Sequence, residues 1–175
     1  MKSLSRPELL SLLKAARSES ERDWLMILVS YWHGLRASEV VGLKRSNFRD
    51  GHLTLQRLKG SLKTVQPLVE NNNPLLNEKA SLERRIAELA PRELVFDISR
   101  VQFWRLIQKH GKAAGIPSHK LHPHILKHSI AMQTIQIAGI ENVRQWLGHK
   151  SIASTGAYLR VSDEQAASAI LAAAL

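Results

Sequence analysis

The 175-residue chain contains no cysteine, which excludes a disulfide framework, a thiolate metal site and a cysteine nucleophile. No run approaches the roughly 18 uninterrupted apolar residues of a membrane-spanning helix, so we expect no membrane span. The first residues, MKSLSRPELLSLLK, lack the apolar core and small-residue cleavage site of a secretory signal. These absences favour a cytoplasmic protein.

Acidic residues are also few, with 15 Asp and Glu against 25 Lys and Arg, for a net charge of +10. A strongly basic domain commonly binds a polyanion, most often nucleic acid. The alternative is a generally basic surface that has no polyanionic ligand. Hydrophobic residues make up 44% of the chain and charged residues 23%, which is typical of a packed globular protein, and the length fits one domain.

Apolar residues recur at helical spacing through most of the chain. A capping box at Ser5 and Glu8 predicts the first helix, and Gly34 is expected to end the second. Alternation over 52–56 and 64–69 predicts a β-hairpin with a basic tip, and Pro67 places its second strand at a sheet edge. The remaining helices are predicted over 20–33, 38–43, 75–89, 99–114, 123–138, 142–147, 151–158 and from 162. The fold class is therefore mostly α with a small antiparallel β-sheet (α+β).

The chain has only two tyrosines, and they lie in different settings. Tyr31 falls in an apolar run and is expected in the core. Tyr158 follows a polar, small-residue segment, where a tyrosine either packs on the surface or offers its oxygen as a nucleophile.

Histidines cluster in the second half, where five of the eight lie between 119 and 149. His124 and His128 are four residues apart and would share one face of a helix, which raises the possibility of zinc. The segment HPHILKH lacks the Glu that follows the first His of the metalloprotease motif, and Lys127 would bring an ammonium beside the metal. We therefore expect neither a metal nor a cofactor.

A second arrangement of the same residues suits a phosphodiester. His124 and Lys127 are three apart and point the same way on a helix, Arg36 follows a helix end, and Lys59 stands on the hairpin tip. Such cations neutralise phosphate oxygens and stabilise charge that develops in a transition state. The alternative is a set of scattered surface charges and capping histidines.

Five short segments occur in an order that resembles one known family. They are 34–40 (GLRASEV), 57–61 (RLKGS) with 66–68 (QPL), 122–129 (HPHILKHS), 146–152 (WLGHKSI) and Tyr158, nine residues after His149. In this order and with these gaps they resemble the boxes of the tyrosine recombinases, or phage-type integrases, over about residues 4–160.

The resemblance implies the catalytic-domain fold of that family over residues 1–161, with a C-terminal tail helix over 162–175 and the N-terminal core-binding domain absent. It implies a site-specific DNA recombinase that cuts and rejoins strands through a 3′-phosphotyrosyl intermediate, without a metal. Tyr158 would be the nucleophile, and Lys59 would protonate the departing 5′ oxygen.

The other boxes imply how the phosphate is held. Arg36, Lys127 and His149 would contact its oxygens, and His124 would assist in proton transfer or phosphate contact. Glu39 would support these residues without touching the substrate.

One position departs from the family pattern, because Lys127 stands where the family has a second arginine. Lysine keeps the charge but lacks the planar fork that binds two oxygens. A neighbour such as His128 or Lys150 would compensate, or the chain would bind DNA without cutting it.

The resemblance also implies partners: double-stranded DNA, and a homo-tetramer on paired DNA sites. The tail helix would pack on its own domain or dock on a neighbouring protomer. Three alternatives to a recombinase stay open at this point. They are a catalytically weak DNA-binding relative acting as a regulator or accessory factor, a type IB topoisomerase, and a helical transcription factor with structural His and Tyr residues.

Overall fold

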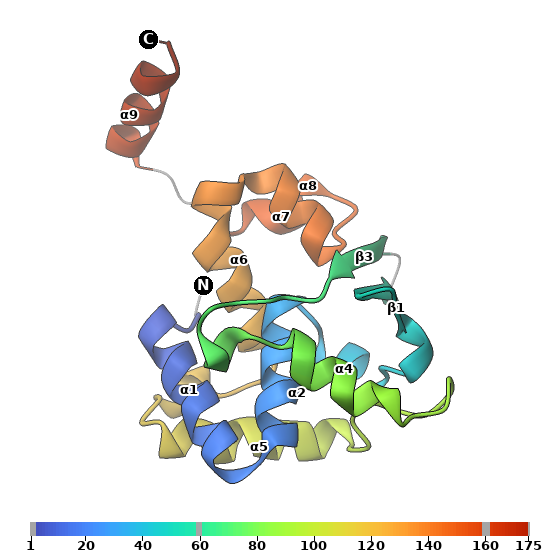
Figure 1. Ribbon diagram of the computed structural model, residues 1–175. Coiled ribbons are helices and arrows are strands. Elements are labelled where there is room, and N and C mark those ends of the chain that lie inside the picture. The colour runs from blue at the N-terminus through green and yellow to red at the C-terminus, as the bar shows by residue number, and fades with distance from the viewer. Residues whose placement is uncertain (1–2, 59–60, 159–161, 175) are drawn as a thin grey trace.

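Helices built on apolar spacing make up most of the computed structural model, which describes residues 3–58, 61–158 and 162–174 (Figure 1). The α-helices are α1 (Arg6–Glu19), α2 (Glu21–Trp32), α3 (Ala37–Val41), α4 (Lys79–Ala87), α5 (Arg100–Ala113), α6 (His124–Ala138), α7 (Ile140–Leu147), α8 (Ile152–Gly156) and α9 (Asp163–Ala174). Short 3-10 turns are η1 (Arg45–Asn47), η2 (Pro74–Leu76) and η3 (Ser118–Lys120).

The first helix begins as its sequence predicts. The Ser5 hydroxyl accepts a hydrogen bond from the Glu8 backbone N–H, and the Glu8 carboxylate accepts one from the Ser5 N–H at 2.7 Å. This reciprocal box satisfies two N–H groups that have no partner inside the helix. Ser99 and Gln102 start α5 in the same way.

The core lies among α1, α2, α5 and α6. Helix α2 is buried along most of its length, and α1, α5 and α6 each turn one apolar face toward the shared interior. Tyr31 is buried here as expected, and its hydroxyl donates to the Gln133 side chain at 2.8 Å. Other fully buried core residues include Leu9, Leu12, Trp24, Ile27, Phe103, Ile107, Ile125 and Leu126.

A small antiparallel sheet flanks the helices, and its strands are β1 (Phe48–Arg49), β2 (His52–Gln56) and β3 (Lys63–Pro67) in the order β1-β2-β3. The β2–β3 hairpin is confirmed, with Thr54 opposite Val65, and Pro67 ends the edge strand. The two-residue β1 is too short to give an alternating pattern, and the sequence did not predict it. The mostly α fold class with a small antiparallel sheet is confirmed.

Two other expectations need correction. The helix expected over 75–89 is shorter, because η2 occupies its start and α4 begins only at Lys79. The alternative that the tail helix packs on its own domain is wrong for the described residues, because α9 has no buried residue and stands apart from the other helices (Figure 1). No helix in the described ranges is long and apolar enough to cross a membrane.

Glycines allow α2 and α7 to meet closely. Gly34 follows α2 with φ of +59°, and a Cβ there would overlap the Leu147 side chain. Gly148 ends α7 with φ of +71°, and a Cβ there would lie 2.6 Å from Cγ of Arg57. The carbonyl of Gly148 accepts a hydrogen bond from the Leu62 N–H at 2.9 Å, which ties the hairpin to this end of α7.

Replacing Gly34 should therefore lower the free energy of unfolding by more than backbone strain alone would. Gly51 has a similar φ of +71° but nothing within 4 Å of an added Cβ, so Gly51→Ala is a matched control for strain. We expect Gly34→Ala to lower the free energy of unfolding by about 1–3 kcal/mol more than Gly51→Ala, from overpacking against Leu147. Urea unfolding measures both, and equal losses would show that the close approach is not tight.

Candidate active site

A polar cavity of about 410 Å³ forms where α3, α6, α7, α8 and the hairpin meet. Five of the six residues expected to be catalytic line it, and so does Lys150. Glu39 and His128 contact these residues without lining the cavity, and Lys59 lies outside the described residues. The lining residues are Arg36, Ser61, His124, Lys127, His149, Lys150, Ser151, Ser154 and Tyr158.

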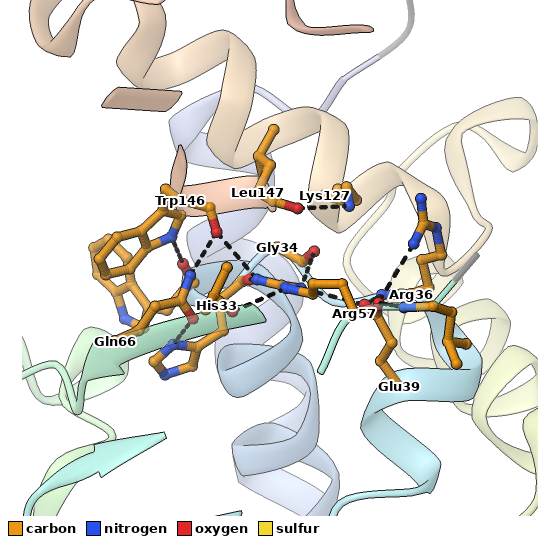
Figure 2. Close-up of polar contacts among 12 residues, drawn as sticks. His33, Gly34, Arg36, Glu39, Arg57, Gln66, Lys127, Trp146 and Leu147 are labelled. Carbon is orange, nitrogen blue, oxygen red and sulfur yellow. Dashed lines mark hydrogen bonds and ion pairs between the residues drawn. The ribbon is translucent and has the colours of Figure 1, made fainter. Parts of the chain in front are cut away.

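Beneath the cavity lies Arg57, to which the sequence analysis assigned no role. Its side chain is buried, with 2% of the residue exposed, and all five of its N–H donors are used (Figure 2). The acceptors come from α3, β3 and α7 and from the two residues that follow α2. They are the carbonyls of His33 (2.7 Å), Gly34 (3.1 Å) and Trp146 (3.1 Å), the Thr64 hydroxyl (3.1 Å) and the Glu39 carboxylate (3.2 Å).

Glu39 connects this buried guanidinium to the cavity. Its carboxylate accepts a hydrogen bond from the Arg36 backbone N–H at 2.8 Å and contacts the Arg36 guanidinium at 3.4 Å. Burial would raise the pKa of Glu39, but the Arg36 hydrogen bond and the charges of Arg57, Lys127 and Arg36 outweigh it and lower that pKa. Glu39 is therefore ionised at neutral pH and orients Arg36 at the start of α3.

Lys127 is a buried residue of the cavity lining, unlike most lysines, which lie on the surface. Only 2% of the residue is exposed, and Nζ donates to the Leu147 carbonyl at 3.5 Å (Figure 2). Burial, followed by the charges of Arg36 and Arg57, lowers the pKa of Lys127 to about 8, although Glu39 acts in the opposite direction. The ammonium is therefore less firmly protonated than a guanidinium at this position would be.

His149 is oriented by a threonine that sequence reasoning missed. Nδ1 of His149 shares a hydrogen bond of 2.9 Å with the hydroxyl of Thr155, which is fully buried on α8. Burial, followed by the charge of Lys127, lowers the pKa of His149 to about 4, so the ring is neutral at pH 7. The position of Thr155, three residues before Tyr158, was the only available signal for its role.

Tyr158 follows α8 and is covered. The residue is 5% exposed, and its hydroxyl lies 2.7 Å from Nδ1 of His128 on α6. Burial raises the pKa of Tyr158, and the charge of Arg36 opposes that effect. The nucleophile expected from the sequence is therefore a neutral phenol held by a histidine.

The histidines of α6 lie one above the other, as their spacing predicts. The ring centroids of His124 and His128 are 5.2 Å apart, and the ring of His128 lies 5.5 Å from that of Tyr158. Burial, followed by His124, lowers the pKa of His128 to about 4. Within the described residues no three His, Cys, Asp or Glu side chains are grouped to hold a metal ion, so the zinc interpretation has no ligand set here.

The cavity lining carries cations, imidazoles and hydroxyls but no carboxylate among the described residues. Arg36, Lys127 and Lys150 bring positive charge, and the phenol of Tyr158 opens on the same space. An anionic group with several oxygens, such as a phosphodiester, matches this lining.

Comparison with known proteins assigns the family. The family model described as "Phage integrase family" matches residues 2–165. The chain belongs to the phage integrase family. The five boxes found in the sequence all lie within the matched region.

Curated relatives within this family include three recombination or regulatory proteins. Tyrosine recombinase XerA of Pyrococcus furiosus is 32% identical over 179 residues, covering 97% of this chain and 60% of that protein. The type 1 fimbriae regulatory protein FimB of Escherichia coli K12 is 32% identical, covering 87% of this chain and 80% of FimB. Tyrosine recombinase XerD of Yersinia pestis is 32% identical over 82% of this chain and 51% of XerD. The chain thus spans about three fifths of the length of the XerA relative.

Solved structures show the same integrase-family fold. The crystal structure of XerA recombinase has a TM-score of 0.73 at 24% identity, covering 96% of this chain and 62% of that one. The XerH recombinase bound to its difH substrate has a TM-score of 0.74 at 19% identity, covering 97% and 54%. These likenesses confirm the catalytic-domain fold expected from the sequence.

Removing the buried guanidinium should leave the Glu39 carboxylate with too few partners. We expect Arg57→Met to lower the free energy of unfolding by about 3–5 kcal/mol, because a buried charge loses its counter-ion. Glu39→Gln in the same chain removes that charge, so the double variant should lose less than the sum of the two single losses. Urea unfolding of all four proteins measures the coupling, and strict additivity would contradict this account of the pair.

Lys127 should reduce the stability of the native state near neutral pH. Its folded-state pKa of about 8 lies below the ordinary value of 10.5, so the unfolded chain binds more protons between these values and stability rises with pH there. Lys127→Met should therefore raise the free energy of unfolding at pH 7 by up to about 3 kcal/mol, at about 1.36 kcal/mol per pKa unit.

This gain should shrink as the pH rises from about 8 to about 10.5, where the ammonium no longer forms in either state. Lys150 is exposed, so Lys150→Met is the control and should change stability little at either pH. Urea unfolding at pH 7 and pH 10 measures the difference. A gain that does not depend on pH would mean that packing, and not charge, is responsible.

Proposed function

We propose that this chain is a site-specific DNA recombinase or integrase that cuts and rejoins DNA strands through a covalent 3′-phosphotyrosyl intermediate. The observation that carries the proposal is the single cavity shared by the Tyr158 phenol and the side chains of Arg36, Lys127 and His149. A nucleophile beside clustered phosphate-binding groups is what phosphoryl transfer to a protein oxygen requires. The family membership supports the same reaction.

The reaction forms one bond and breaks one in each direction. The Tyr158 oxygen attacks phosphorus, the Oη–P bond forms and the bond from phosphorus to the 5′ oxygen breaks. The leaving oxygen takes a proton from Lys59, the acid expected from the sequence. A free 5′ hydroxyl then reverses the steps and rejoins a strand. Because the phosphotyrosyl bond preserves the phosphoester linkage, no nucleotide and no metal are needed.

The cations and the imidazoles would act at different points of the phosphate. Arg36 would hold one non-bridging oxygen, with Glu39 fixing the direction of its guanidinium. Lys127 and His149 would stabilise the negative charge that develops on the phosphate oxygens in the transition state, where fixed donors contribute most. His124, which lines the same cavity, would contact the phosphate from α6.

We further propose that the substrate is double-stranded DNA, bound in the cytoplasm by residues 1–161 as the catalytic domain. The net charge of +10 supports a polyanionic ligand. Solved relatives of similar fold include XerH bound to difH and a lambda integrase tetramer bound to a Holliday junction, the latter with a TM-score of 0.66. By analogy we propose that this chain acts as a homo-tetramer on paired sites.

The tail helix is the proposed contact between protomers. Ile170 and Leu171 of α9 are 69% and 63% exposed. Large apolar side chains that are exposed side by side often mark a surface that contacts another protein. An apolar cavity of about 250 Å³, bordered by Trp32, Val143 and Leu147 among others, lies between α2, α6 and α7. We propose that α9 of one copy docks in this cavity of the next.

One observation favours a second candidate, a DNA-binding relative that cuts weakly and acts as a regulator or accessory factor. Lys127 replaces the family's arginine, and its Nζ contacts the Leu147 carbonyl. A point charge in that position grips a phosphate less well than a guanidinium fork does.

A suicide substrate tests the proposed function. A nicked DNA site that loses its short 5′-OH fragment should trap this chain as a covalent adduct, seen as a shift on a denaturing gel. Tyr158→Phe should bind the same DNA and form no adduct, because only the nucleophilic oxygen is removed. Tyr31→Phe removes the oxygen of the other tyrosine, which is bonded to Gln133, and should still form the adduct.

Two outcomes would change the assignment. An adduct formed by Tyr158→Phe would show that another residue attacks. A parent chain that binds but never forms an adduct, while Lys127→Arg does, would favour the weakly cutting regulator.

A further inference from the structure

His128 contacts the oxygen of Tyr158 that would attack phosphorus. Nδ1 of His128 lies 2.7 Å from the phenol oxygen, a strong hydrogen-bond distance, and the contact joins α6 to the turn that follows α8. The reacting atom of the proposed nucleophile is therefore held by an imidazole.

The protonation states of the two groups allow the phenol to donate this bond. Burial, followed by His124, lowers the pKa of His128, which is about 4, while burial raises the pKa of Tyr158. At neutral pH the imidazole is thus unprotonated and the phenol keeps its proton. In the Nε2–H tautomer of this neutral ring the phenol O–H donates and Nδ1 accepts, which is the ground-state arrangement of a nucleophile and its base.

Other groups near Tyr158 are less suited to take this proton. His149 uses its Nδ1 on the Thr155 hydroxyl, and Lys127 is directed at the Leu147 carbonyl. His124 lines the cavity, but its ring packs against that of His128, at 5.2 Å between centroids. His128 is the group already in contact with the reacting oxygen.

We propose that His128 is a catalytic residue, the proton acceptor for Tyr158 in strand cleavage and the proton donor to it in rejoining. The proposal rests on the proposed function. As the Oη–P bond forms and the P–O5′ bond breaks, the phenol proton passes to Nδ1 of His128, and the 5′ oxygen takes its proton from the separate acid. In rejoining, the imidazolium returns the proton to the departing phenol oxygen.

The charges around the His128 ring indicate how bound DNA would make its imidazole more basic. The groups that disfavour an imidazolium are His124, His122 and Lys127, and the phenol of Tyr158 faces the ring from the α8 side. A phosphodiester in the cavity brings negative charge that offsets these neighbours. The base is therefore weak in the free protein and strengthened when a substrate phosphate is present.

The test is single-turnover cleavage of the suicide substrate by His128→Gln and His128→Ala. Glutamine keeps a hydrogen-bond acceptor but cannot carry the proton. We expect both variants to bind DNA as the parent does and to cleave about 10²–10⁴ times more slowly, the usual worth of general-base catalysis. Added imidazole should restore part of the rate of His128→Ala. His119→Gln, at an exposed site, is the matched control and should cleave at the parent rate.

A second substrate separates the base from the acid. A 5′-bridging phosphorothiolate leaves as a thiolate and needs no proton. It should rescue Lys59→Ala and leave His128→Gln slow, because the nucleophile must still lose its proton.

The proposal is overturned if His128→Gln cleaves within a few-fold of the parent, which would mean that the contact only positions the phenol. It is also overturned if the phosphorothiolate rescues His128→Gln, which would assign His128 to the leaving group. Failure of the parent to form any adduct, on either substrate, would instead reject the proposed function, and the role of His128 with it.

Discussion

A buried ion pair between Arg57 and Glu39 is the interaction on which the site depends. A guanidinium removed from water is costly unless every donor finds an acceptor, and here all five do. The acceptors belong to segments far apart in the sequence, so satisfying one side chain fixes the relative positions of α2, α3, α7 and the hairpin. Glu39, which is held by Arg57, in turn fixes the position of Arg36, and Arg36 lines the cavity.

Close backbone approach is the second requirement, and it follows from the first. The carbonyls that Arg57 binds at His33, Gly34 and Trp146 lie where the ends of two helices converge. Gly34 and Gly148 supply the positive φ values and the missing Cβ atoms that allow this convergence. Gly34 and Gly148 belong to the family-like segments 34–40 and 146–152, so these motifs reflect packing as well as chemistry.

The helices, the hairpin and most of the cavity residues were predictable from the sequence because local patterns determine them. Caps, helical spacing and one alternating hairpin located the elements, and the boxes identified the residues that line the cavity. The supporting network was not predictable. Arg57 and Thr155 carry no local signal of burial, because their partners lie on other elements. The contact of His128 with Tyr158 depends on where α8 meets α6, and the short β1 is held by pairing and not by its own residues.

The cavity concentrates like charge before any ligand arrives. Arg36 and Arg57 both act against the protonation of Lys127, and Glu39 alone among the groups that act on it favours its charge. The unliganded domain therefore holds an electrostatic repulsion that a phosphate would relieve. Ligand binding then lowers the free energy of the folded state twice, through the contacts it makes and through the repulsion it removes. A domain built this way is least stable when it is alone, and its free energy of unfolding rises with the logarithm of the ligand concentration once that concentration exceeds Kd.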